Sequence, residues 1–192
     1  MKDLIFLKND IKKIAANFKK GKIGIFPTDT IYGMGGRADK PAVIKKIYYF
    51  KKRDKNKPLL ILVNSIAMAK KYVKISQIQE KTLRNFWPAK LTVIFKSKNI
   101  LPKEITGGTD KIGVRLPDDK FLAEIIKKLA VPLIATSANI SGGQNVLDIQ
   151  NIKIKSDFIV DGGKLPESKP STIIDFTGEN IKILRKGDVD IK

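Results

Sequence analysis

Apolar positions follow two different spacings along the chain, and the change of spacing separates the predicted helices from the predicted strands. Helical spacing begins directly after five residues of types that commonly cap helix N-termini: Asn9, Asp39, Ser65, Ser76 and Asp118. Short apolar runs bounded by turn residues predict strands between and after these helices. The predicted strands cover 22–26, 59–63, 91–95, 112–116, 132–135, 158–160, 172–175 and 181–184.

The order of these elements predicts an α/β fold. Strands alternate with helices over the first two-thirds of the chain and are followed mostly by strands, which favours a single domain built on a twisted mixed sheet flanked by helices. Loops that leave strand ends are then the places where we expect a ligand. The segment 142–171 is the least regular part and is a candidate for mobility.

Composition excludes several kinds of chemistry. The 192 residues include 42% hydrophobic and 30% charged positions, which suits one folded domain, and they include neither Cys nor His. Disulfides, thiolate nucleophiles, imidazole bases and the usual zinc ligands are therefore excluded. No apolar run approaches the roughly 20 residues that span a bilayer, so we expect a cytoplasmic protein without a membrane partner.

The net charge allows two interpretations. Lys and Arg number 38 against 19 acidic residues, which gives a formal charge of +19. Such an excess attracts polyanions such as RNA or nucleotide phosphates. A general preference for Lys, Ile and Asn in the source proteome would produce the same surplus, so charge alone does not decide between them.

Three common enzyme classes lack their motifs here. The chain has no Gly-x-x-x-x-Gly-Lys-Ser/Thr phosphate loop, no glycine spacing typical of dinucleotide binding and no Gly-x-Ser-x-Gly elbow. A P-loop nucleotidase, a nicotinamide-dependent oxidoreductase and a serine hydrolase are therefore not favoured.

Four clusters of polar residues do follow predicted strands or helices. The loop Pro27-Thr-Asp-Thr-Ile-Tyr-Gly33 presents hydroxyls and a carboxylate, and Gly33, Gly35 and Gly36 are expected to let the backbone approach a ligand closely. This suits a ligand loop or a turn that satisfies its own backbone; taken alone, the turn is the more common outcome. Lys51 and Arg53 converge on phosphates only if the helix ends near Lys51, and otherwise form a solvated basic helix end. Two further clusters are the pair Ser137 and Asn139 after a strand and the strand-end arginines Arg115 and Arg185.

Together these clusters resemble the YrdC/Sua5 family of threonylcarbamoyl-AMP synthases, which begin the threonylcarbamoyl modification of tRNA adenosine 37. The resemblance covers roughly residues 8 to 187 and is specific because several motifs occur in the family's order. The matching segments are 27–33, Lys51-x-Arg53, 87–92, 114–117, Ser137-x-Asn139, 171–175 and 184–187.

The chain also departs from the family pattern. Ala89-Lys90 stands where Gly-Pro is usual, Asp54 replaces a common Pro, Asp119 lies where His is frequent, and Lys57 occupies a position often filled by Asn or His. The retained pairs favour the synthase branch over YciO-like relatives. The resemblance further implies a short, TsaC-type form in which residues 1–192 make one YrdC-like catalytic domain with a basic concave site and without the additional Sua5 domain.

The resemblance implies a reaction and its partners. L-threonine, bicarbonate and ATP would give L-threonylcarbamoyladenylate and pyrophosphate, with Mg²⁺ accompanying ATP and no tightly bound cofactor. Proteins that transfer the product to tRNA would act downstream, and tRNA or double-stranded RNA is a further possible partner. An RNA-binding module without synthase activity is the alternative function.

The resemblance also implies roles for individual residues. Asp29 is expected to be structural and to hold backbone or a basic side chain, because a carboxylate repels phosphates. The expected catalytic residues are Lys51 and Arg53; the nucleotide site adds Ser137, Asn139, Asn145 and Arg185; the threonine site comprises Thr28, Tyr32, Lys57, Arg115 and Ser171.

Overall fold

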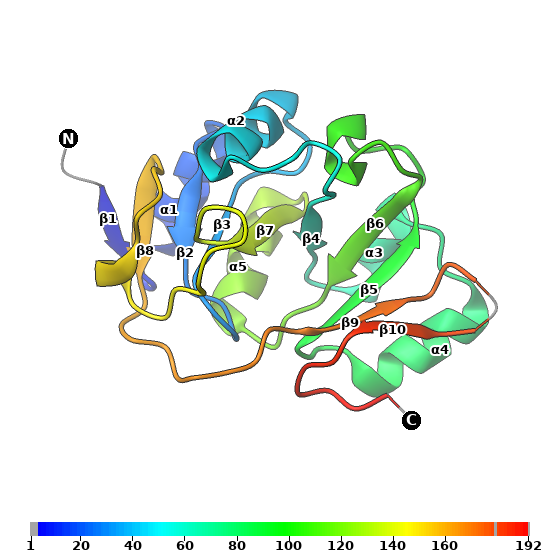
Figure 1. Cartoon of the computed structure of the whole chain (residues 1–192). Helices are drawn as coiled ribbons and strands as arrows, with labels where there is room; N and C mark the ends of the chain where they lie inside the picture. Colours follow the sequence, from blue (N-terminus) through cyan, green and yellow to red (C-terminus); the bar gives the residue numbers. More distant parts are fainter. Residues whose placement is uncertain (1–3, 179, 192) are drawn as a thin grey trace.

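The computed structural model describes residues 4–178 and 180–191, which form one mixed α/β unit (Figure 1). Ten strands make a single sheet in the order β1-β8-β2-β3-β7-β4-β6-β5-β9-β10. The strands are β1 (Ile5–Leu7), β2 (Gly24–Phe26), β3 (Gly33–Gly35), β4 (Leu60–Leu62), β5 (Leu91–Lys96), β6 (Lys111–Arg115), β7 (Leu133–Ser137), β8 (Phe158–Asp161), β9 (Thr172–Asp175) and β10 (Lys182–Arg185). The helices are α1 (Ile11–Lys19), α2 (Pro41–Lys51), α3 (Ile66–Tyr72), α4 (Gln77–Phe86) and α5 (Lys120–Leu129), with short 3-10 turns η1 (Lys103–Thr106) and η2 (Ile149–Asn151).

Strand β7 joins the two halves of the sheet. It pairs antiparallel with β3 on one side, where Gly33 lies opposite Ser137, and antiparallel with β4 on the other, where Ile61 lies opposite Ile134. Ser137 is the last residue of β7, and Asn139 lies in the loop that follows it. This pair therefore stands near the middle of the whole sheet.

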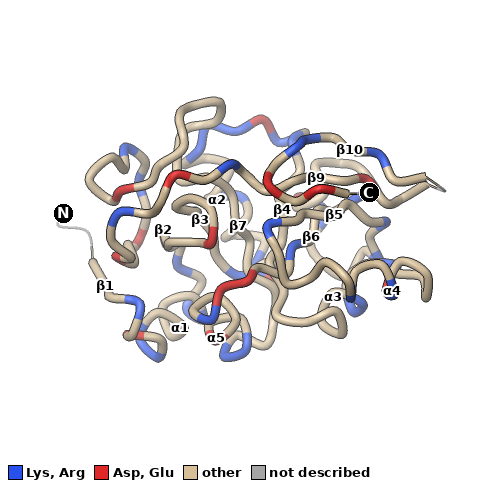
Figure 2. The backbone as a smooth tube through the Cα atoms, turned by 90° about the horizontal axis from the view of Figure 1, so that it is seen from below, with Lys and Arg blue, Asp and Glu red and all other residues tan. Residues whose placement is uncertain are grey.

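Both faces of the first half of the sheet are covered. Because side chains alternate along a strand, neighbouring residues of β2 point to opposite faces: Ile25 packs in the core cluster that includes α2, and Phe26 packs in the cluster that includes α1 and α5. Helices α1 and α5 lie side by side (Figure 2). The prediction of a mixed sheet flanked by helices is confirmed.

The glycine run after the first loop forms a strand, although the sequence predicted an open loop there. A Cβ atom on Gly35 would lie 1.7 Å from the backbone oxygen of Ile134, and one on Gly36 would lie 2.6 Å from a methyl group of Val43. These two glycines therefore let β3 approach β7 and helix α2. The expectation that they admit a ligand is wrong for Gly35 and Gly36, whereas Gly33 does line a cavity.

Two of the five predicted helix caps are confirmed. The Ser65 hydroxyl accepts a hydrogen bond from Met68 N, and Ser76 forms a capping box with Gln79. In the other three helices the N-cap residue lies one position later than predicted, at Asp10, Lys40 and Asp119 instead of Asn9, Asp39 and Asp118.

Side-chain contacts explain the shifted N-caps of α2 and α5. The carboxylate of Asp39 forms a two-pronged pair with Arg37, at 2.9 and 2.6 Å, and is not available to the helix. The carboxylate of Asp119, the second of two adjacent acidic residues, accepts the hydrogen bond from Leu122 N at 2.9 Å.

Within the described residues, no helix combines the length and apolarity needed to cross a bilayer.

Candidate functional site

A cavity of about 340 Å³ lies where the loop between β2 and β3 meets the ends of β6 and β7. The strand-end loops where a ligand was expected thus do meet at a cavity, and ligand binding there stays a prediction. Among its lining residues are seven that the sequence placed in the site: Thr28, Arg53, Arg115, Ser137, Asn145, Ser171 and Arg185. Lys51, Asn139, Tyr32 and Lys57 do not line it.

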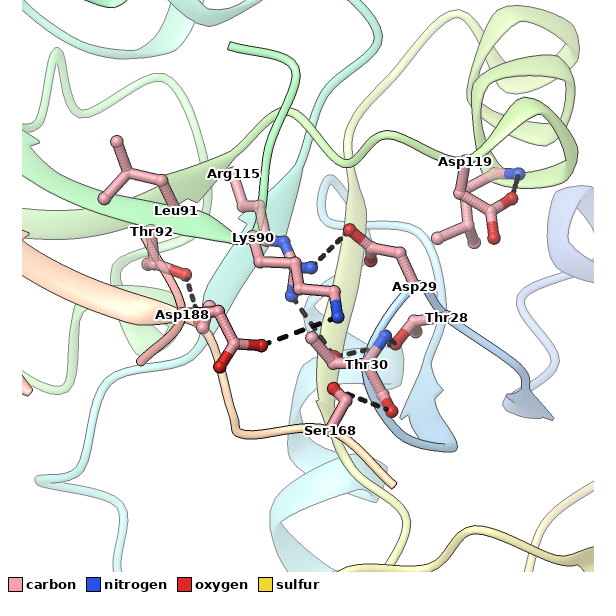
Figure 3. A network of polar contacts seen from close by, with 12 residues as sticks. Thr28, Asp29, Thr30, Lys90, Leu91, Thr92, Arg115, Asp119, Ser168 and Asp188 are labelled. Carbon is pink, nitrogen blue, oxygen red and sulfur yellow. Dashed lines mark hydrogen bonds and ion pairs between the residues drawn. The ribbon is translucent and has the colours of Figure 1, made fainter. Parts of the chain in front are cut away.

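A buried ion pair forms one wall of the cavity. Nη2 of Arg115 lies 2.5 Å from Oδ2 of Asp29, and the two side chains are 7% and 10% exposed (Figure 3). The expectation that Asp29 holds a basic side chain is confirmed. Neither carboxylate oxygen of Asp29, and neither Nε nor Nη2 of Arg115, makes an aligned hydrogen bond to a described group. Buried polar atoms are normally satisfied, so this pair has hydrogen-bonding capacity left for a ligand.

Three arginines give the cavity a positive character. Arg53, Arg115 and Arg185 all line it, and Asp29 is the single acidic residue among the described lining residues. Burial, followed by the nearby charge of Arg115, lowers the pKa of Arg185, and burial lowers the pKa of Arg53. An anion bound among these guanidinium groups would relieve both the desolvation and the mutual repulsion.

Ser171 is held in place by hydrogen bonds from two directions. Arg185 donates from Nε to the Ser171 carbonyl at 2.9 Å and from Nη2 to its hydroxyl at 3.1 Å. The Ser171 hydroxyl also lies 2.9 Å from the Thr92 hydroxyl. Thr92 is buried and lines the cavity, but the sequence predicted no role for it. The only indication in the sequence was its position within the matched segment 87–92.

The Thr28 hydroxyl is occupied by its own loop. It donates to the Ile31 carbonyl at 2.7 Å and accepts from the backbone N–H groups of Thr30 and Ile31 at 3.1 and 3.2 Å. The interpretation as a turn that satisfies its own backbone is therefore confirmed for this hydroxyl. The same loop lines the cavity, and ligand binding by the loop stays a prediction.

Lys51 is fully buried at the end of α2. Its ammonium donates to the Ser137 carbonyl, to the Asn139 carbonyl at 2.6 Å and to Asn139 Oδ1 at 3.3 Å. Burial, followed by the charge of Arg53, lowers the pKa of Lys51 to about 8. The three oxygens oppose this effect because they favour the protonated form. Lys51 therefore ties α2 to the segment that follows β7.

Asn139 connects Ser137 to the turn that follows it in the chain. Its side-chain oxygen accepts from the Ser137 hydroxyl at 2.5 Å, and its Nδ2 donates to the carbonyls of Gly143 and Gln144 at 2.6 and 2.9 Å. These bonds shape the turn that brings Asn145 to the cavity. Asn139 thus acts on the cavity through its neighbours in this structure.

Tyr32 and Lys57 are engaged away from the cavity. The Tyr32 ring is fully buried, its hydroxyl donates to the Gly163 carbonyl at 2.7 Å, and burial raises its pKa. Lys57 is exposed, and its backbone carbonyl, not its ammonium, accepts from Arg53 Nε at 3.2 Å. Substrate contact by either side chain stays a prediction.

A second, larger cavity of about 1080 Å³ lies beside the end of α2 and η1. Its wall includes Tyr49, whose side chain is 79% exposed, and it shares Arg53 with the first cavity. Its charged lining residues are Lys45, Lys52, Arg53, Lys55, Lys103, Lys153, Lys155 and Glu104.

Comparison with known proteins shows where this architecture occurs elsewhere. The Sua5/YciO/YrdC family model, described as telomere recombination, matches residues 16–187. A Methanocaldococcus jannaschii protein named provisionally as a threonylcarbamoyl-AMP synthase is 36% identical over 195 residues, which cover 100% of this chain and 88% of that protein. The threonylcarbamoyl-AMP synthase of Pyrococcus abyssi is 33% identical over 94% of this chain, which spans only 55% of that relative.

Solved structures of related proteins have the same fold. The Pyrococcus abyssi Sua5 protein complexed with L-threonine superposes with a TM-score of 0.87 at 31% identity, covering 96% of this chain and 56% of that one. Escherichia coli YciO superposes with a TM-score of 0.87 at 22% identity, over 98% of this chain and 96% of that one, which shows a common fold.

The enclosure of Lys51 predicts a stability effect. Replacing Lys51 by Met leaves the part-buried carbonyls of Ser137 and Asn139 without this donor and should lower the free energy of unfolding by about 2 kcal/mol, measured by urea denaturation at pH 7. Lys45→Met, on the exposed side of the same helix, is the matched control and should change it little.

A comparison of the wild type with Lys51→Met at different pH values also tests the pKa of Lys51. Its folded-state pKa of about 8 lies below its ordinary value of 10.5, so between these values the unfolded chain binds more protons. The stability of the wild type relative to Lys51→Met should therefore increase as the pH rises from 8 to 10. A difference that is constant or decreases over this range contradicts the lowered pKa.

Proposed function

Because the chain belongs to the Sua5/YciO/YrdC family, we propose that it is a threonylcarbamoyl-AMP synthase, acting as a single catalytic domain in tRNA threonylcarbamoyladenosine modification. Its substrates are L-threonine, bicarbonate and ATP. The observation that carries this proposal is the arginine-lined cavity, in which Arg115 is buried with unused hydrogen-bond donors. The named relatives and the L-threonine complex of the Pyrococcus abyssi protein support it.

The reaction is a nucleotidyl transfer. The threonine amine and bicarbonate form a carbamate with loss of water, and a carbamate oxygen attacks the α-phosphorus of ATP while pyrophosphate leaves. The nucleophile is already an anion, so the protein has to align it and to balance negative charge, tasks that require neither His nor Cys. Arg53, Arg115 and Arg185 all line the cavity, and we assign Arg53 and Arg185 to the phosphates and Arg115 to the threonine carboxylate.

Ser171 is the candidate for contact with the threonine hydroxyl. Its own hydroxyl is oriented by Thr92 and Arg185, so a substrate group meets it in a fixed position. Ser137 and Asn145 complete the nucleotide end of the cavity. Thr28 contributes shape and a methyl group more than a donor, because its proton is used by the Ile31 carbonyl.

Lys51 contributes to catalysis from behind the cavity. Its ammonium is enclosed by three oxygens of Ser137 and Asn139, so we assign it to holding the nucleotide loop in place, not to direct contact with phosphate. Lys51 is therefore still expected to be required for synthesis, but as a residue that positions the loop and not as a phosphate ligand.

Mg²⁺ would be brought by ATP. The carboxylate that lines the cavity, Asp29, is paired with Arg115 and is a poor metal ligand in that state. When bound, the ion supplies neutralisation of the phosphate charge. The product is a mixed anhydride, and we expect a separate enzyme to transfer its threonylcarbamoyl group to tRNA with release of AMP.

The direct test of the function is product formation. Purified protein is incubated with ATP, Mg²⁺, bicarbonate and labelled L-threonine, and the adenylate and pyrophosphate are measured by chromatography. We expect both products, and we expect neither when bicarbonate is removed. Pyrophosphate release that does not depend on bicarbonate would be inconsistent with this reaction.

Arg115 should separate the two substrates kinetically. Arg115→Ala should raise the apparent KM for threonine by about tenfold to a hundredfold, because a charge-assisted bond contributes about 1.5–3 kcal/mol, and should affect the KM for ATP much less. Arg84→Ala, at an exposed position on α4, is the control. Equal effects on both KM values would remove Arg115 from the threonine site.

One observation favours a second activity, the binding of single-stranded RNA. The larger cavity is lined by seven cations and one carboxylate, and the exposed ring of Tyr49 offers a surface on which an unpaired base can stack. This would be an addition to synthesis and not a replacement for it.

Fluorescence anisotropy with a labelled RNA 12-mer tests this second activity. Tyr49→Ala should weaken binding by about fivefold to a hundredfold, from loss of roughly 1–3 kcal/mol of stacking, while the rate of adenylate synthesis is unchanged. The control, Lys13→Ala, removes an exposed charge on α1 and should have little effect. Affinities that are equal for the wild type and Tyr49→Ala would exclude this cavity as an RNA site.

A further inference from the structure

Asp29 carries a charge that its surroundings do not use fully. Its side chain is nine-tenths buried, it lines the 340 Å³ cavity, and its charge partner among the described residues is Arg115. Its other oxygen, Oδ1, has no hydrogen-bond partner in the described part of the chain. A buried carboxylate oxygen without a donor is costly, so a ligand that supplies a donor there gains binding energy.

A role limited to orienting Arg115 does not explain this arrangement. An orienting carboxylate normally engages the guanidinium through two parallel hydrogen bonds, as Asp39 does with Arg37 in this same protein. Asp29 instead makes one close contact, which is not aligned as a hydrogen bond, and leaves Oδ1 free. Arg115 likewise retains Nε without a partner.

The two unused groups have opposite charges, and their residues line the same cavity. Figure 3 shows the side chains of Asp29 and Arg115 pointing toward one another. A free α-amino acid carries an ammonium and a carboxylate on one carbon atom, and it matches such a pair in both sign and proximity. We propose that Asp29 binds the ammonium group of the amino-acid substrate while Arg115 binds its carboxylate. This inference rests on the proposed function and adds a residue that recognises the amine.

The placement of charge also separates the two substrates. A carboxylate disfavours a phosphate nearby. Asp29 is the one acidic residue among the described lining residues, and it is paired with Arg115, whereas Arg53 and Arg185 line the cavity without a carboxylate partner among the ion pairs of the described residues. ATP is thereby directed to the arginines, and the amine that must become a carbamate is held beside Asp29. Recognition of the ammonium also discriminates against hydroxy acids, which cannot form the carbamate.

The test compares two ligands that differ at one group. Isothermal titration measures binding of L-threonine and of (2S,3R)-2,3-dihydroxybutanoate, in which a hydroxyl replaces the amine. The wild type should bind threonine at least tenfold more tightly. Asp29→Asn should reduce this preference to less than threefold, mainly by weakening threonine, and the exposed Asp110→Asn control should retain it.

Several results would overturn the inference. Equal weakening of both ligands by Asp29→Asn would show a structural role alone. If that variant does not fold, the wild-type comparison decides, because equal affinity for the two ligands excludes recognition of the ammonium. Equal affinity with normal adenylate synthesis overturns this inference and leaves the proposed function intact. Absence of threonine binding and of synthesis overturns both.

Discussion

The ion pair between Asp29 and Arg115 connects parts of the sheet that do not touch through their strands. Asp29 belongs to the loop between β2 and β3, and Arg115 ends β6, with β7 and β4 between them in the sheet. Burying two charges is favourable only when they are paired and further satisfied. This pair is close but incompletely hydrogen-bonded, so it both defines the cavity and leaves it ready for a charged ligand.

A second buried cation fixes the other side of the cavity. Lys51 replaces its water shell with three oxygens from Ser137 and Asn139, and Asn139 then orders the turn leading to Asn145. The positions of Ser137 and Asn145, which we propose to bind the nucleotide, thus depend on a side chain that does not line the cavity. The phosphate site that we propose does not depend on a glycine-rich phosphate loop, because packing positions its backbone and arginines.

Much of this arrangement could be predicted from the sequence, and the failures have physical reasons. The grouping of Thr28, Arg115, Ser171 and Arg185 followed from the order of the motifs, and these residues do line one cavity. Their roles in binding stay predictions. Strand β3 was missed because glycines have low strand propensity, and only the close approach to Ile134 shows why they are there. The enclosure of Lys51 was not predictable, since a lysine in a basic run is usually solvated and its partners lie 86 and 88 residues away.

The most direct measurement of the central claim is a crystal structure of the protein with L-threonine and a non-hydrolysable ATP analogue. The threonine carboxylate should lie within hydrogen-bond distance of the Arg115 guanidinium, with the triphosphate near Arg53 and Arg185. Threonine bound outside this cavity, or an Arg115 that contacts only Asp29 while threonine is bound, would contradict it.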